Sequence, residues 1–251
     1  MTRREAAGPR PVAMLVTSVV VGMLVGATMA WRTPVATAGA PTGAPADVLD
    51  PVPGVPPELV QRLGRVAVRI EASRCDGPVQ GSGVLLDNGS VVTNRHVLEA
   101  ASGARMVGTD GSTRPLQEYT TQTLEDLAVA TVGPSTGSTP DGADERPDDA
   151  GQDPLPAPVE PGDTVVVAGY PGGAPLSVTA GSVSSWVDGA DYSLGPDPVL
   201  LTDVTVIGGS SGSGVFDLDG RLVGIVAARD LATGGAVVIP AARLELPQHS
   251  G

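Results

Sequence analysis

The side chains that could do chemistry in this chain are a histidine, an aspartate and a serine, in that order. Only two histidines occur in 251 residues. His249 is two residues from the C-terminal end, whereas His96 lies in the segment GSVVTNRHVLEAA. Asp126 follows in DLAV and Ser211 in GGSSGSGVF. A base, an acid that orients the base and a nucleophile are the groups needed for acyl transfer through a covalent intermediate.

The glycines around Ser211 strengthen this interpretation. Glycine allows a tight turn and a close backbone approach, so a serine hydroxyl can be exposed at the turn. The same turn can direct the main-chain N–H groups of Gly209 and Ser211 at a developing oxyanion. Taken singly, a Gly/Ser turn, one histidine after a strand and one acid before a strand are ordinary structural features. Together they predict a His96, Asp126 and Ser211 triad with an oxyanion hole formed by Gly209 and Ser211.

The rest of the chain predicts an all-β fold in two lobes. It contains only six aromatic residues, so Val, Ala, Leu and Ile must fill the core. Short Val-rich runs punctuated by Gly and Pro favour strands. A short helix is expected at Glu58 to Leu63. The strands are expected at 66–70, 82–87, 90–94, 105–109, near 113–122 and at 127–132 in the first group, and at 164–170, 177–187, 198–206, 214–220, 221–229 and 235–240 in the second.

Two segments rich in proline are predicted to connect other parts of the chain. Residues 32–57 hold seven prolines and predict an extended stalk of roughly 80 Å at most, at about 3.1 Å per residue. Residues 134–163 hold eight acidic residues, one arginine and seven prolines. Such a composition stays solvated and predicts a connector between the two lobes. The expected organisation is an N-terminal segment (1–11), an apolar segment (12–31), the linker (32–57), a folded domain (58–245) with lobes at 64–133 and 164–240, and a tail (246–251).

The N-terminal region predicts membrane targeting. Residues 12–31 carry no charge and are long enough to cross a hydrocarbon layer of roughly 30 Å. Arginines dominate the residues before this segment, which places the N-terminus in the cytoplasm and the rest of the chain outside it. Small residues at 28–30 and 36–38 resemble cleavage sites of a secretory signal. A retained single-pass anchor is therefore expected, with a cleaved signal and a secreted product as the alternative.

Charge and cysteine content exclude some partners. The net charge is −13, and no basic patch is visible, which argues against nucleic acid. Clusters of His and Cys that could bind a metal are absent, so no metal and no cofactor are expected. Cys75 has no partner in the sequence; we expect a buried and inert thiol, with an intermolecular bridge as the alternative.

These motifs together resemble the trypsin-like serine peptidases, especially their bacterial Deg-type and membrane-anchored periplasmic branch. TNRHV is similar to the histidine segment of that family, DLAV to its aspartate segment, and GSSGSGVFDLDGRLVGIV to its serine segment. The resemblance covers roughly residues 64–240, including GYPGG at 169–173. It implies two six-stranded antiparallel barrels with the active site between them. It also implies that His96 is the base, Asp126 its orienter and Ser211 the nucleophile of a serine endopeptidase.

The resemblance also implies where a polypeptide substrate binds. A substrate strand would add to Ala227, Ala228 and Arg229, while Gly235 or its neighbour Gly234 would line the primary pocket. Thr205 stands six residues before Ser211, where an acid would favour cleavage after Lys or Arg. A preference for small or medium apolar side chains is therefore expected.

The sequence departs from the family pattern at two positions beside these motifs. Arg95 replaces the usual alanine before the histidine, and Gly214 replaces a usual proline. Eleven residues follow Pro240, so no C-terminal PDZ module is expected.

Three other functions stay open at this stage. The segment GGSSG also matches a nucleophile elbow with Ser210 as nucleophile, which would make the protein an α/β-hydrolase esterase using His249. A trypsin-fold binding module without activity is the second alternative. The third is a tethered structural domain with no site.

Overall fold

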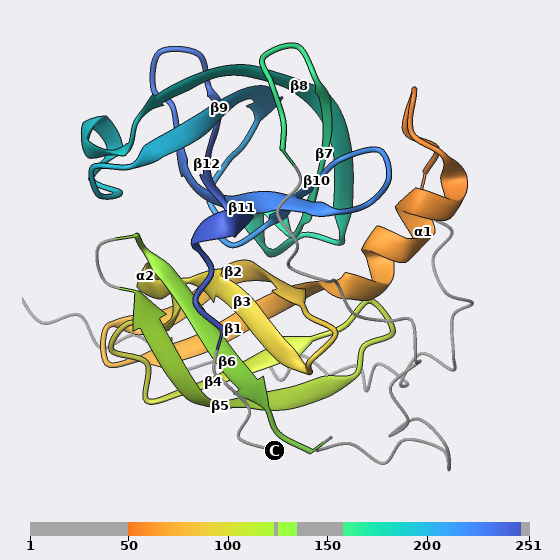
Figure 1. Ribbon diagram of the computed structural model, residues 1–251. Coiled ribbons are helices and arrows are strands. Elements are labelled where there is room, and N and C mark those ends of the chain that lie inside the picture. Colours follow the sequence, from red (N-terminus) through yellow and green to blue (C-terminus); the bar gives the residue numbers. More distant parts are fainter. Residues whose placement is uncertain (1–49, 123–124, 135–157, 247–251) are drawn as a thin grey trace, which may run out of the picture. The chain divides into compact units, whose positions relative to one another are not determined.

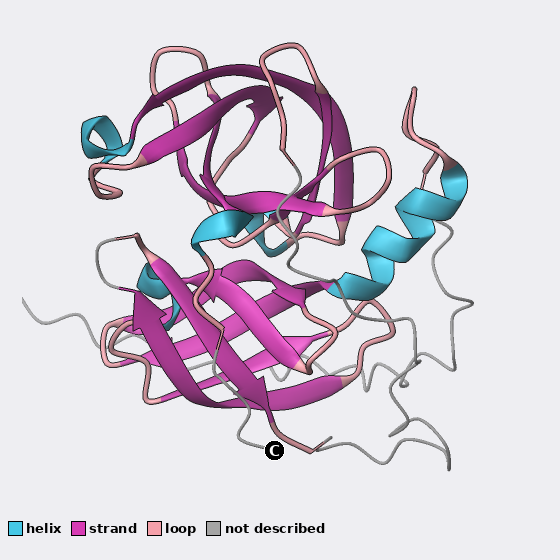
Figure 2. Ribbon diagram, in the orientation of Figure 1, coloured by secondary structure: helices cyan, strands magenta, loops and turns pink. Residues whose placement is uncertain are grey.

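The computed structural model describes residues 50–122, 125–134 and 158–246. Strands make up most of it, with one longer helix and short helical turns (Figure 2). The helical elements are α1 (Pro57–Val66), α2 (Arg95–Leu98), η1 (Pro171–Gly173), η2 (Gly189–Tyr192) and η3 (Ala241–Arg243). The strands are β1 (Ala67–Arg74), β2 (Gly77–Leu85), β3 (Ser90–Asn94), β4 (Gly103–Val107), β5 (Thr113–Gln122), β6 (Leu127–Val132), β7 (Thr164–Gly169), β8 (Ser177–Asp188), β9 (Pro198–Thr205), β10 (Gly214–Phe216), β11 (Leu222–Arg229) and β12 (Gly235–Pro240).

The strands close into two antiparallel barrels. Barrel one has the order β1-β2-β3-β6-β5-β4, and barrel two has the order β10-β11-β12-β9-β8-β7. Figure 1 shows barrel one in orange to yellow-green below barrel two in green to blue. The predicted all-β fold of two six-stranded barrels is confirmed. Closure of each sheet into a barrel leaves few strand edges free. Free edges of short, Val-rich strands could otherwise pair with other chains.

Helix α1 differs from the prediction in length. It runs from Pro57 to Val66, so Val66 ends the helix instead of opening the first strand. Pro57 at the first helical position and Glu58 in the first turn favour this start. Leu59, Val60, Leu63, Gly64 and Val66 form its buried side. The apolar spacing of a helix therefore continues further along the chain than the expected strand allowed.

The expected strand at 214–220 is also shorter in the structure. Strand β10 ends at Phe216, and a turn follows. In this turn the Asp217 N–H donates to the Arg221 carbonyl, and the Gly220 N–H donates to the Asp217 carbonyl. Gly220 adopts a φ of 79°, which other residues rarely do. The sequence DLDG therefore forms a turn between β10 and β11.

The core has a part in each barrel and a part shared between them. One apolar cluster lies inside barrel one and another inside barrel two. The largest cluster joins α1 (Leu59, Leu63) to barrel one (Val84, Leu86) and barrel two (Phe216, Leu222). The two barrels are therefore packed on each other and on α1.

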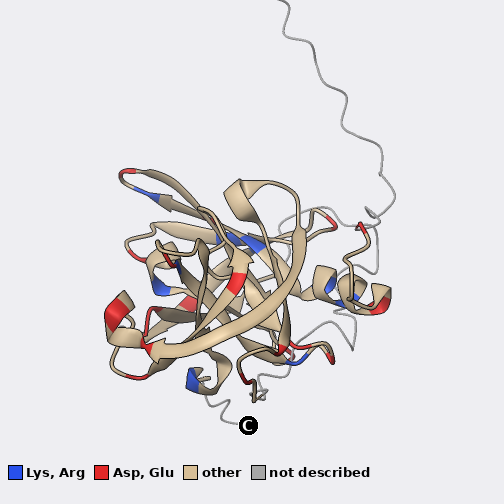
Figure 3. Ribbon diagram, turned by 90° about the horizontal axis from the view of Figure 1, so that it is seen from above, with Lys and Arg blue, Asp and Glu red and all other residues tan. Residues whose placement is uncertain are grey.

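Charged residues of the described chain are interspersed, not grouped by sign (Figure 3). Several arginines lie beside acids, as in the pairs of Glu71 with Arg69 and Arg105, and of Arg221 with Asp217 and Asp219. Among the described residues, the arginines thus form no positive patch that would attract a polyanion.

The predicted anchor (12–31) and most of the acidic connector (134–163) lie outside the described residues. Among the residues that the structure describes, no helix is long and apolar enough to cross a membrane. The anchor stays a prediction.

Candidate active site

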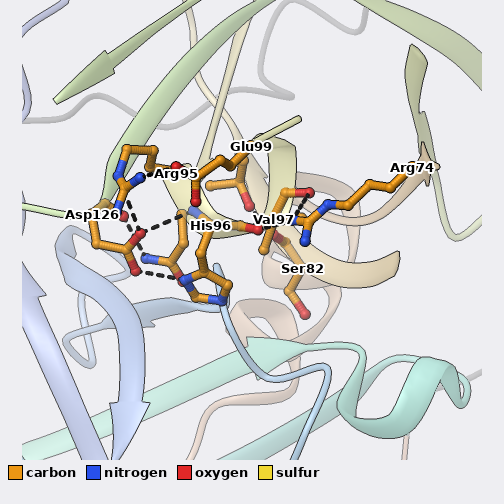
Figure 4. A network of polar contacts seen from close by, with 9 residues as sticks. Arg74, Ser82, Arg95, His96, Val97, Glu99 and Asp126 are labelled. Carbon is orange, nitrogen blue, oxygen red and sulfur yellow. Dashed lines mark hydrogen bonds and ion pairs between the residues drawn. The ribbon is translucent and has the colours of Figure 1, made fainter. Parts of the chain in front are cut away.

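His96 and Asp126 meet at one end of barrel one. Asn94 ends β3, and His96 follows in the single turn of α2. Asp126 directly precedes β6, whose first residue Leu127 pairs with Asn94. The β3–β6 register therefore places the two side chains together. The distance from His96 Nδ1 to Asp126 Oδ2 is 2.6 Å (Figure 4).

Both carboxylate oxygens of Asp126 contact His96. Oδ2 contacts the imidazole, and Oδ1 accepts a hydrogen bond of 2.9 Å from the main-chain N–H of His96. The side chain of Asp126 is 12% exposed and that of His96 is 43% exposed. A carboxylate at Nδ1 orients the ring and leaves Nε2 as the atom that can exchange a proton with a substrate or nucleophile.

The main chain around this pair is held by further bonds. The carbonyl of Asp126 accepts from the main-chain N–H of Arg95 and from the side-chain amide of Asn94, both at 3.0 Å. Asp126 itself has a φ of 53°, in the left-handed region that aspartate tolerates better than most residues. These bonds hold Asp126 in a conformation that places its carboxylate under the imidazole.

Two arginines complete the surroundings of α2. Arg74 donates to the carbonyls of His96 and Val97, which lie at the end of this short helix (Figure 4). Arg95 pairs with Glu99 at 2.5 Å, and its Nε lies 3.9 Å from Asp126 Oδ1. The arginine at the position of the usual alanine thus lies beside the carboxylate without taking its hydrogen bonds to His96.

Ser211 lies in the loop between β9 and β10 of barrel two. The main chain of Ser210 bonds to Ile207 and that of Ser213 to Ser210, so two consecutive turns shape this loop. Gly209 and Gly212 adopt φ values of 89° and 87°. An ideal Cβ on Gly209 would lie 2.6 Å from the Gly172 nitrogen, so only glycine fits there. The Gly-rich sequence is therefore needed for the observed turn.

The bonded carbonyls of this loop determine where its N–H groups point. The Gly208 carbonyl accepts from Gly172 at 2.6 Å, and the Ser210 carbonyl accepts from Ser213 at 3.0 Å. No peptide bond in the described chain is cis. In a planar trans peptide the N–H points away from the carbonyl. The N–H groups of Gly209 and Ser211 are thus directed away from the bonded carbonyls of Gly208 and Ser210.

Gly81 lies between the histidine helix and the serine loop. An ideal Cβ on Gly81 would lie 2.8 Å from a methyl group of Val97 and 3.2 Å from the Ser211 carbonyl oxygen. The structure therefore brings α2 and the Ser211 loop against the same residue of β2. Within residues 50–122, 125–134 and 158–246, no hydrogen bond joins the Ser211 hydroxyl to His96. The third contact of the triad stays a prediction.

The five residues expected at the substrate site lie together in barrel two. Thr205 pairs with Gly235 across β9 and β12, and Arg229 and Ala228 pair with the next two residues of β12. Ala227 is the extra residue of a bulge in β11 and is buried in the core. Gly235 is closely approached by Thr202, since an ideal Cβ would lie 2.0 Å from its carbonyl oxygen. Their roles in binding stay predictions.

Some residues of this site were not expected from the sequence. Arg74 gave no signal, because arginine near a turn is common on protein surfaces. The close contact of β2 with the Ser211 loop was also not expected. Its signal in the sequence is the run Gly81-Ser82-Gly83, because glycines inside a strand mark places where another main chain approaches closely. The thiol of Cys75 is free and exposed, so the expected burial of this residue is wrong.

Comparison with known proteins identifies the family. The family model described as a trypsin-like peptidase domain matches residues 81–225, which include His96, Asp126 and Ser211. The chain belongs to this family. The nucleophile-elbow alternative with Ser210 is wrong, because it requires a parallel α/β sheet, whereas Ser210 lies in a loop of an antiparallel barrel.

The relatives in this family of trypsin-like peptidases are longer proteins. One named "Probable periplasmic serine endoprotease DegP-like" from Rhizobium meliloti is 34% identical over 163 residues. Another of the same name from Brucella suis is 33% identical over 165 residues. Each match covers 64% of this chain but only 30% and 29% of the relative. The chain thus spans under a third of these relatives.

Solved structures show the same trypsin-like fold. The Rv3671c protease from M. tuberculosis in its active form superposes with a TM-score of 0.61 at 21% identity, covering 80% of this chain and 88% of that chain. The serine endoprotease from Yersinia pestis superposes with a TM-score of 0.58 at 24% identity, covering 74% and 62%.

Proposed function

We propose that this protein is a serine endopeptidase in which His96, Asp126 and Ser211 form the catalytic triad. The observation that carries the proposal is the 2.6 Å contact between His96 Nδ1 and Asp126 Oδ2. The helix that holds His96 packs against Gly81, and so does the Ser211 loop. The family assignment and the relatives named as serine endoproteases support the same activity.

The reaction follows from the roles of these groups. His96 Nε2 takes the hydroxyl proton of Ser211 as the serine oxygen attacks the peptide carbonyl. Asp126 stabilises the imidazolium that forms and keeps its ring oriented. The imidazolium then gives its proton to the leaving amine as the peptide bond breaks, and an acyl-enzyme ester remains on Ser211. Water attacks this ester with His96 again as base, which releases the acid and restores the serine.

The oxyanion of the tetrahedral intermediate is assigned to the N–H groups of Gly209 and Ser211. The bonded carbonyls of Gly208 and Ser210 support this, because they turn both N–H groups away from the loop's own contacts. Each such donor contributes roughly 3 kcal/mol to stabilising the transition state.

The substrate is proposed to bind as an added strand on β11. Strand β10 pairs with β11 at Leu222, Gly224 and Ile225, and the neighbouring loop bonds only as far as Val226. The edge at Ala227, Ala228 and Arg229 that faces away from β12 thus has no strand partner among the described residues. Main-chain hydrogen bonds on that edge would hold an extended peptide. With Thr205 in place of an acid, small or medium apolar residues are the proposed preference at the cleaved position.

We also propose that the peptidase acts outside the cytoplasm, attached through residues 12–31. The uncharged segment preceded by arginines supports this placement, as do relatives named as periplasmic. Blotting the membrane fraction for the full-length chain tests it, and a soluble, shortened product would refute the anchor.

Active-site labelling tests the proposed activity. The full chain treated with a fluorophosphonate should be labelled on Ser211, and Ser211→Ala should lose both labelling and peptide hydrolysis. Ser184→Ala, at an exposed serine of β8, serves as the control and should keep both. A folded wild-type chain that takes no label would instead support a trypsin-fold binding module without activity.

A further inference from the structure

Ser82 lies where the two barrels contact each other, and it bonds to residues of both. It belongs to β2 of barrel one and is 0% exposed. A buried hydroxyl without partners is costly, so the bonds that it makes are informative about why a serine is there.

The hydroxyl of Ser82 bonds to barrel two on both sides. It accepts a hydrogen bond of 2.8 Å from the main-chain N–H of Tyr170, which follows β7. It donates one of 2.9 Å to the carbonyl of Gly209. Because a hydroxyl has a single proton, the N–H of Tyr170 must take a lone pair and the proton must go to Gly209.

The main chain of Ser82 fixes the same loop at a second point. Its N–H donates to the Ser211 carbonyl at 2.8 Å. Its carbonyl accepts from the Thr93 hydroxyl at 2.6 Å and lies so close to Gly212 that an ideal Cβ there would be 1.9 Å away. Barrel one therefore contacts the Ser211 loop through both the side chain and the backbone of one residue.

The carbonyl that Ser82 binds lies between the two proposed oxyanion donors. The peptide linking Gly209 to Ser210 follows the Gly209 N–H and precedes the Ser211 N–H. Its carbonyl bonds to Ser82, so rotation of this peptide would break that bond. A loop whose residues include glycines at φ values near 90° has several accessible conformations without such a contact.

We infer that Ser82 is a positioning residue that holds the Gly209–Ser210 peptide, and with it both oxyanion donors, from the opposite barrel. The inference rests on the proposed function of Ser211. It predicts that the donors are aligned only when both barrels are assembled.

Replacing Ser82 by alanine tests this role. Ser82→Ala should lower kcat by about 10- to 100-fold with little change in KM, because misplaced donors weaken only the transition state. Affinity for a peptide aldehyde, whose adduct carries the oxyanion, should fall by the same factor. Amide hydrogen exchange at residues 209–212 should accelerate, a readout that does not depend on turnover.

Tyr170→Phe is the matched control. The Tyr170 hydroxyl donates to the Ala67 carbonyl at 3.4 Å, so this variant also removes a bond between the barrels but leaves the Gly209 contact in place. It should lower the melting temperature and keep kcat. If Ser82→Ala does not fold, Ser82→Cys retains a weak donor of similar size and should give an intermediate kcat.

The outcomes separate the two proposals. A labelled, active wild type together with Ser82→Ala of unchanged kcat and unchanged exchange would overturn the role of Ser82 alone. Equal loss of kcat in Ser82→Ala and Tyr170→Phe would also overturn it, because assembly of the barrels would then be the cause. A folded wild type without labelling would overturn the proposed peptidase activity.

Discussion

Asp126 shows how much of the candidate site depends on single residues. Its two carboxylate oxygens bond to the ring and to the main chain of His96, and its own carbonyl bonds to Arg95 and Asn94. It also carries a left-handed φ, a conformation that persists only where the surrounding contacts favour it. A residue held by so many bonds orients the imidazole without needing to move.

The catalytic value of this carboxylate can be measured with a change of one atom. Asp126→Asn keeps the size of the side chain but presents an amide to His96 Nδ1, which favours the wrong tautomer of the ring. In serine peptidases the equivalent change lowers kcat about 10⁴-fold. We expect a loss of about 10³- to 10⁴-fold, measured as kcat on a peptide substrate, with a near-native circular dichroism spectrum.

Glu125→Gln is the control for this prediction. Glu125 is the neighbouring carboxyl, and it contacts Gln122 rather than His96. Its variant should keep kcat close to that of the wild type. If Asp126→Asn retained full activity, the carboxylate would have no part in the reaction.

At the scale of elements, the loop from β11 to β12 joins the proposed substrate edge to the proposed pocket. Asp230 closes this loop by accepting hydrogen bonds from the Thr233 hydroxyl at 2.6 Å and from the Thr233 N–H at 3.0 Å. The hydroxyl of Tyr192 donates to the same carboxylate at 3.3 Å. The main chain of Asp230 also bonds to Gly235 at 2.9 Å and to Gly234 at 2.8 Å. Side-chain and main-chain bonds together therefore set the separation of Arg229 and Gly235, which flank the loop.

The loop should make stability depend on pH in the acid range. The bond from the Thr233 hydroxyl, followed by main-chain N–H bonds, lowers the pKa of Asp230 below its ordinary value. A carboxyl with a lowered pKa stabilises the fold above the ordinary pKa of aspartate, near 4, and loses that contribution as pH falls through the folded value. The melting temperature of Asp230→Asn should therefore lie below that of the wild type at pH 7, with a smaller difference near pH 3. A difference that grew on acidification would contradict this role.

At the scale of the whole molecule, the assembly of the described unit depends on α1 as well as on the barrels. Its buried side joins a cluster that contains Val84 of barrel one and Phe216 of barrel two. Arg62 on the same helix donates to the carbonyl of Asp219 in barrel two. The helix therefore stabilises the contact between barrels from outside the strands.

A cavity in this cluster should be costly. Leu63 is 0% exposed, and Leu63→Ala should lower the free energy of unfolding by about 2–5 kcal/mol, measured by urea denaturation. Gln61→Ala, at an exposed position of the same helix, should change it by less than about 0.5 kcal/mol. Equal effects of the two changes would show that α1 does not belong to the shared core.

The local features of the fold were predictable because they depend on neighbours in sequence. The strand spans 90–94, 127–132 and 235–240 are the same in the structure as in the prediction. The helix was expected to end at Leu63 and ends at Val66. The apolar spacing at Val66 fits a helix as well as the expected strand, and burial in the core shared by both barrels decides for the helix. Periodicity cannot report what lies on the other side of an apolar face.

The sequence by itself determined the residue types and order of the proposed triad, the glycines that the Ser211 loop requires, and the alternation that makes strands. The tertiary structure decided that Asp126 Oδ2 lies 2.6 Å from His96 Nδ1, and that the Ser82 hydroxyl of barrel one donates a hydrogen bond to the Gly209 carbonyl of barrel two. These contacts join residues 30 and 127 positions apart. The physical reason is that strand register and barrel packing, which set such distances, are properties of the closed sheets and not of any single segment.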